Sequence, residues 1–113
     1  MKIFTLPSSE NWICDRFTEE WKKYTPELNT ENILEADIIW LLADWCWNQI
    51  DSRILMQKKV VASVHHITPS KFDEREKQLF ALRDQVVDAY HVPCHKTKEQ
   101  IQDLTTKPIY TFP

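Results

Sequence analysis

Five short apolar segments, separated by longer polar stretches, constrain the fold of this chain more than any other feature of its sequence. Two of them, residues 38–42 and 60–64, are almost continuously apolar and do not alternate as half-exposed strands do. Such runs are typical of strands that are covered on both faces, as in a parallel sheet. We therefore predict strands over residues 2–6, 37–43, 59–65, 86–92 and 108–112.

Segments with helical spacing or capping residues lie between these strands. We predict helices over residues 10–24, 48–56, 70–85 and 97–104, the last two opened by the capping boxes Ser70-x-x-Asp73 and Thr97-x-x-Gln100. Strands that alternate with helices are joined by right-handed crossovers in a parallel sheet. The prediction is an α/β fold: one Rossmann-like domain over residues 1–113, with a doubly wound parallel sheet of about five strands.

The chain contains no glycine in 113 residues. This excludes the phosphate-binding loops and the nucleophile elbow that need glycine at fixed positions. With 14 basic against 17 acidic side chains, the net charge of −3 gives no reason to expect a nucleic-acid partner. Three scattered cysteines and the lack of an apolar run near 20 residues predict a cytoplasmic protein without a transmembrane segment.

Ligands of doubly wound sheets bind beyond the carboxyl ends of the strands, so the residues that follow each strand are the candidates for a site. Behind the first two predicted strands lie polar residues at a helix start and a carboxylate beside two large aromatic rings. This pairing suits a sugar, which has an apolar face and a polar rim. The candidates are Ser8, Ser9, Glu10, Asn11, Asp44, Trp45 and Trp47.

Histidines follow the next two strands: His65 and His66 after one, His91 and His95 at the end of the other. We expect His65, His66 and His91 to contribute to a polar ligand site. Cys94 makes a zinc site or a cysteine nucleophile conceivable, but the spacing matches no known zinc pattern, and we assign no metal ligand. The simpler interpretation of these residues is structural: serines cap helices and tryptophans pack in cores.

The segment KVVASVHH, residues 59–66, resembles a strand in the amino-terminal half of retaining GT-B glycosyltransferases of the family 4 type. Residues 11–16, 37–40 and 90–93 are also similar to short bacterial members of that family. The resemblance extends over essentially the whole chain. It implies an enzyme that transfers a sugar from a nucleotide-sugar donor to a sugar, glycan or lipid acceptor.

The resemblance also implies roles for individual residues. His65 would face the cleft near the donor sugar, with His66 at the following variable position, and the loop at residues 8–11 would line the cleft. In this scheme Asp44 orients an acceptor hydroxyl, and Trp45 or Trp47 stacks on the acceptor. No cofactor is expected. The nucleotide sugar is the donor substrate, and the family binds it mainly in a second, carboxyl-terminal half.

The chain alone is therefore expected to be catalytically incomplete, as a half that pairs with a missing domain or forms a homodimer. Two alternatives remain open at this stage. The chain could be a stand-alone flavodoxin-like binding or interaction module, or a small His/Cys metal-binding protein.

Overall fold

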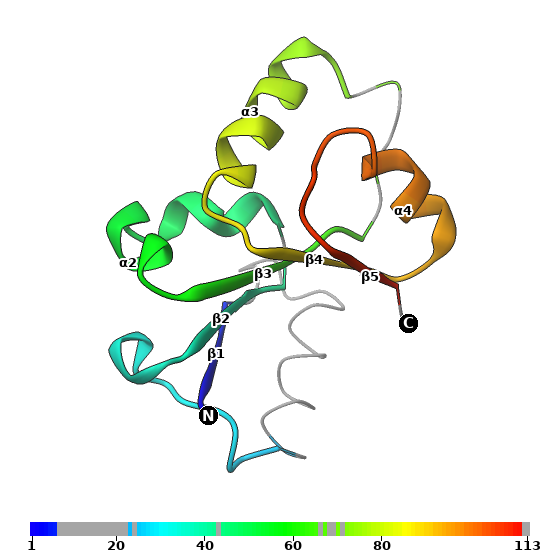
Figure 1. The fold of residues 1–113 in the computed structure, drawn as a ribbon. Coiled ribbons are helices and arrows are strands. Elements are labelled where there is room, and N and C mark those ends of the chain that lie inside the picture. Colours follow the sequence, from blue (N-terminus) through cyan, green and yellow to red (C-terminus); the bar gives the residue numbers. More distant parts are fainter. Residues whose placement is uncertain are drawn as a thin grey trace.

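The computed structural model describes residues 1–6, 23, 25–42, 44–65, 67, 70 and 72–111. Its centre is a five-stranded sheet in which every neighbouring pair of strands is parallel (Figure 1). The strands are β1 (Ile3–Leu6), β2 (Ile38–Leu41), β3 (Lys59–Ser63), β4 (Ala89–Val92) and β5 (Ile109–Thr111). The prediction of a parallel, Rossmann-like α/β fold is confirmed.

The strand order in the sheet is β1-β2-β3-β4-β5. Alternation of strands and helices leaves this order open, because it fixes direction and handedness but not which strands are neighbours. A doubly wound sheet reverses its order at one strand, and the ligand crevice opens there. The five described strands contain no such reversal, so the doubly wound order that we predicted is not found among them, and no switch point within them selects a binding position.

Right-handed connections between strands in unreversed order place their helices on one face of the sheet. Figure 1 shows this for α2 (Ser52–Met56), α3 (Glu74–Asp84) and α4 (His95–Ile101), which all lie on the same side. The apolar core fills the space between them and the sheet. Its fully buried members are Ile39, Leu41, Leu55, Val60, Ala62, Val64, Phe80, Val87, Tyr90, Val92 and Ile101.

The core follows from the alternation of side chains along each strand. Val60 and Ala62 of β3 point toward the helices and are fully buried, as is Tyr90 in register with Ala62 on β4. The Phe80 ring of α3 stacks on the Tyr90 ring, with centroids 5.5 Å apart and ring planes 14° apart. Each of the three helices therefore contributes to a single apolar layer.

The helices begin at different residues from those we predicted. A 3-10 helix (Asp44–Gln49) and the short α2 replace the single helix expected over 48–56, because Asp51 caps α2 by accepting a bond from the Arg53 amide at 2.9 Å. In α3 the N-cap is Asp73, not Ser70. In α4 it is Cys94, so Thr97 lies inside the helix.

Two strand boundaries also shift, and one predicted helix lies almost entirely outside the described residues. The strand expected over 59–65 ends at Ser63, and the one expected over 86–92 begins at Ala89. The helix predicted over 10–24 falls on residues of which only Lys23 is described. Among the helices that are described, none has the length and apolar composition needed to cross a bilayer.

Candidate functional site

His65 lies two residues beyond the end of β3 and is half-buried. Its Nε2 atom is 2.7 Å from the carbonyl oxygen of Leu42, which follows β2. A carbonyl oxygen can only accept, so Nε2 carries the proton and donates it. In the neutral ring, Nδ1 is then the acceptor atom. The sheet thus places an imidazole of defined tautomer at the carboxyl ends of two neighbouring strands.

The backbone around His65 is held by hydrogen bonds from β4 and α4. The Val64 amide donates to the His91 carbonyl at 2.9 Å. The Thr97 hydroxyl donates to the His65 carbonyl at 3.4 Å, and the Gln100 side-chain amide donates to the Ile67 carbonyl at 3.1 Å. The segment that carries His65 is therefore tied to the sheet at its start and to α4 on either side of residue 66.

His91 makes a different set of contacts, on the face of the sheet that points away from α2, α3 and α4. Its Nδ1 atom is 2.9 Å from the Ser63 hydroxyl, which also accepts a bond from the Trp40 indole at 2.9 Å. The Trp40 and His91 rings meet edge to face, with centroids 6.3 Å apart. Ser63 and His91 are 1% and 7% exposed. His91, which we predicted as a ligand-binding residue, is thus a buried member of a polar network across β2, β3 and β4.

Cys94 and His95 lie at the start of α4 and are both exposed. The Cys94 sulfur is 3.5 Å from the Thr97 hydroxyl oxygen. This hydrogen bond lowers the pKa of the Cys94 thiol below its ordinary value, and the Thr97 and Lys96 amides act in the same direction. The thiol has a stabilised charged form. The described contacts of His91 and His95 include no bond to it, so these contacts do not supply the base that a nucleophile needs.

The aromatic candidates after β2 are only partly described. Trp47 is half-buried and packs against the apolar core, which is the structural role of a tryptophan. The backbone of Asp44 and Trp45 forms the start of the 3-10 helix, and their side chains are not described. The remaining candidates, Ser8, Ser9, Glu10, Asn11 and His66, lie outside the described residues.

A metal centre finds no support in the described part of the chain, where no three His, Cys, Asp or Glu side chains converge as ligands. His65 follows β3 and His91 lies in the neighbouring β4, but their rings bond to different partners, the Leu42 carbonyl and the Ser63 hydroxyl.

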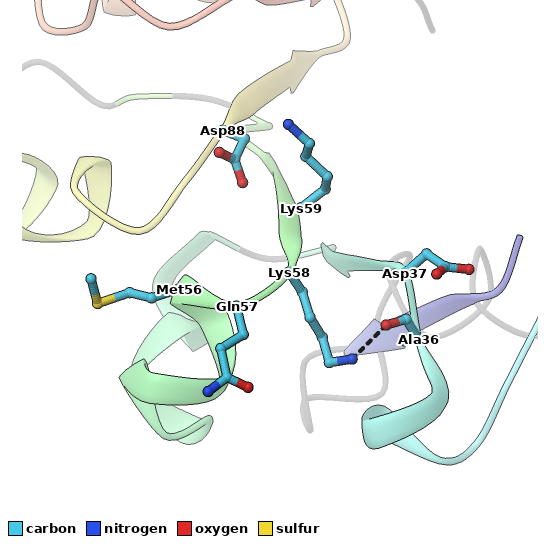
Figure 2. A pocket seen from close by; sticks show the side chains of 7 residues that line it. All are labelled: Ala36, Asp37, Met56, Gln57, Lys58, Lys59 and Asp88. Carbon is cyan, nitrogen blue, oxygen red and sulfur yellow. Dashed lines mark hydrogen bonds between the residues drawn. The ribbon is translucent and has the colours of Figure 1, made fainter.

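A cavity of about 440 Å³ opens at the other end of the sheet, at the amino ends of β2, β3 and β4 (Figure 2). Three of its four charged side chains, those of Asp37, Lys58 and Asp88, are engaged with the backbone, and the fourth, Lys59, is exposed. Lys58 donates to the Ala36 carbonyl at 2.6 Å, and Asp88 accepts from the Val60 amide at 2.8 Å. Asp37 accepts from the Lys2 amide at 2.8 Å. These bonds connect the amino ends of the strands, which is a structural role.

Sequence reasoning missed three residues around His65 and His91. Ser63 lies within an apolar strand, Thr97 looked like a helix cap, and Gln100 looked like its reciprocal partner. Thr97 and Gln100 bond to backbone carbonyls, and a carbonyl is present at every residue. No pattern of residue types could have indicated these contacts.

No family model, curated protein or solved structure matches this chain.

Proposed function

We propose that this chain is the acceptor-side, amino-terminal half of a GT-B glycosyltransferase, which transfers a sugar from a nucleotide-sugar donor to a sugar, glycan or lipid acceptor. Two features support the proposal. The parallel α/β sheet is the architecture that the sequence resemblance implies. His65, the residue that the resemblance places beside the donor sugar, follows the central strand at the carboxyl edge, where ligands of such sheets bind.

The observation that carries the proposal is the hydrogen bond between His65 Nε2 and the Leu42 carbonyl, 2.7 Å long. The bond fixes the tautomer and the orientation of the ring at the carboxyl edge of the sheet, where a polar ring can meet a sugar. Half-burial also strengthens a hydrogen bond to a ligand, because less water competes for it.

The chemistry assigned to this half is binding and orientation. In the transfer, the bond from the anomeric carbon to the diphosphate oxygen breaks, and a bond to the acceptor oxygen forms while the acceptor loses its proton. Charge develops on the diphosphate and on the sugar ring, and positioned donors and acceptors stabilise it. We assign His65 to the sugar, Asp44 and Trp45 to the acceptor, and the nucleotide contacts to a second half.

Replacement of His65 tests this function in the enzyme formed with that second half. His65→Ala should lower kcat/KM by at least about tenfold, the effect of losing a hydrogen bond to the reacting sugar. His95→Ala is the matched control, since His95 is exposed at the start of α4, and it should leave turnover unchanged. Normal turnover of His65→Ala would remove His65 from the site.

The reading frame of the source gene provides the complementary test. A continuation past codon 113 into a second set of alternating strands and helices with a pair of glutamates would supply the donor half. A native protein with the mass of this chain alone, 13.5 kDa, would exclude the proposed function unless a separate chain supplied that half.

A further inference from the structure

The described part of the loop after β3 accepts hydrogen bonds from side chains of a helix that is distant in the sequence. Two carbonyls within three residues, those of His65 and Ile67, accept bonds from α4 at 3.4 and 3.1 Å. The donors, Thr97 and Gln100, are 32 and 33 positions away along the chain from the residues they hold. The two bonds thus hold the carbonyls on either side of residue 66.

The donors are themselves firmly placed. Thr97 is 3% exposed, inside α4, and α4 is packed on the sheet by the fully buried Ile101. Gln100 is half-buried one turn further along the same helix. Residues three apart on a helix lie on one face, so both side chains reach the loop from the same direction. The loop is therefore bonded to a helix, α4, that packs on the core.

We propose that Thr97 and Gln100 are positioning residues for His65, which hold its backbone where the ring meets the Leu42 carbonyl. This inference rests on the proposed function for its biological meaning, because a fixed ring matters only if a ligand uses it. A 2.7 Å bond from a ring to a carbonyl tolerates little displacement of the backbone that carries the ring. Groups that bind or react are commonly supported by such outer contacts.

The test replaces each donor by an apolar side chain of similar shape: Thr97→Val, Gln100→Met, and both together. The readout is the NMR spectrum of the chain labelled with ¹⁵N in its four histidine rings, with His65 assigned from its loss in His65→Ala. We expect the bound Nε2 proton of His65 to exchange with water about fivefold faster in each single variant, and more in the double variant. Thr97→Ser keeps the hydroxyl and should restore the slow exchange.

Two controls separate positioning from other effects. Cys94→Ala removes the sulfur that also contacts Thr97, and Glu99→Gln changes an exposed residue of the same helix. Both should leave the His65 ring signals unchanged. If Thr97→Val does not fold, as judged by the backbone amide spectrum, Gln100→Met carries the test alone.

A folded double variant with wild-type tautomer and exchange at His65 would overturn the inference. This readout needs no substrate, so it is independent of the proposed function. Sugar binding by the wild type, and its weakening in the double variant, tests the two together. If the His65 ring is fixed in the wild type but His65→Ala does not change turnover, the proposed function is refuted. The positioning of His65 by Thr97 and Gln100 then still stands.

Discussion

At the scale of single residues, the Asp84 carboxylate is the centre of a group of short hydrogen bonds. One of its oxygens accepts hydrogen bonds from the Tyr90 phenol and from the Thr105 hydroxyl, both at 2.6 Å. Lys107 donates to the main-chain carbonyls of Asp84 and Val87 nearby. The carboxylate thus connects the end of α3 to β4 and to the loop before β5.

Tyr90→Phe should destabilise the fold by about 2 kcal/mol, because it removes a short bond to a charged group and leaves the ring stack with Phe80 in place. Urea unfolding followed by circular dichroism measures this loss. Tyr110→Phe is the control, since Tyr110 is 56% exposed, and it should change the free energy of unfolding little. Equal stability of Tyr90→Phe and wild type would show that the Asp84 bond contributes nothing net.

The same tyrosine gives stability a pH dependence of defined sign. Burial raises the pKa of the Tyr90 phenol well above its ordinary value, and the bond to Asp84 raises that pKa further. An unfolded tyrosine titrates near pH 10. Above that pH the unfolded chain loses a proton that the folded chain keeps, so stability falls as pH rises, by at most about 1.4 kcal/mol per pH unit from this group. The fall should be smaller in Tyr90→Phe, in which this group is absent.

At the scale of elements, the start of α3 depends on one side chain. Asp73 Oδ1 accepts a bond from the Glu76 amide at 3.0 Å, which satisfies one of the amides at the helix start. Asp73→Ala should cost about 1 kcal/mol, and Asp73→Ser should recover most of it. Ser70→Ala is the control, because Ser70 precedes α3 and is exposed. A larger loss from Ser70→Ala, measured by thermal unfolding, would contradict this assignment of the cap.

The elements also show which parts of the fold the sequence could predict. The strands were predictable because most residues of the 38–42 and 60–64 runs are buried and the others are partly buried, and burial selects apolar residue types. The start of α4 was not predictable, because Cys94 occupies the N-cap in an extended conformation without a capping hydrogen bond from its side chain. The candidate site shows the same difference. The position of His65 beyond a strand was predictable from residue types, but its tautomer was not, because it depends on a backbone carbonyl, that of Leu42.

At the scale of the whole molecule, the unreversed strand order makes β3 the centre of the sheet and leaves β1 and β5 at its edges. The two edges differ. The outer side of β1 is covered, because the Ile3 amide donates to the Leu28 carbonyl and the Ile3 carbonyl accepts from the Thr30 amide. β5 has three residues and pairs with β4 alone among the described strands.

Amide hydrogen exchange should therefore rank the strands, with β3 slowest, β1 intermediate and β5 fastest. β3 exchanges only when the paired strands on both sides open, and Val60 and Ala62 are fully buried. β5 should separate more easily, since Ile109 is only partly buried against the core and Tyr110 is mostly exposed. Exchange measured residue by residue by NMR gives the ranking. Amides of β5 as slow as those of β3 would contradict it, and would mean that another segment or a second molecule covers the outer edge of β5.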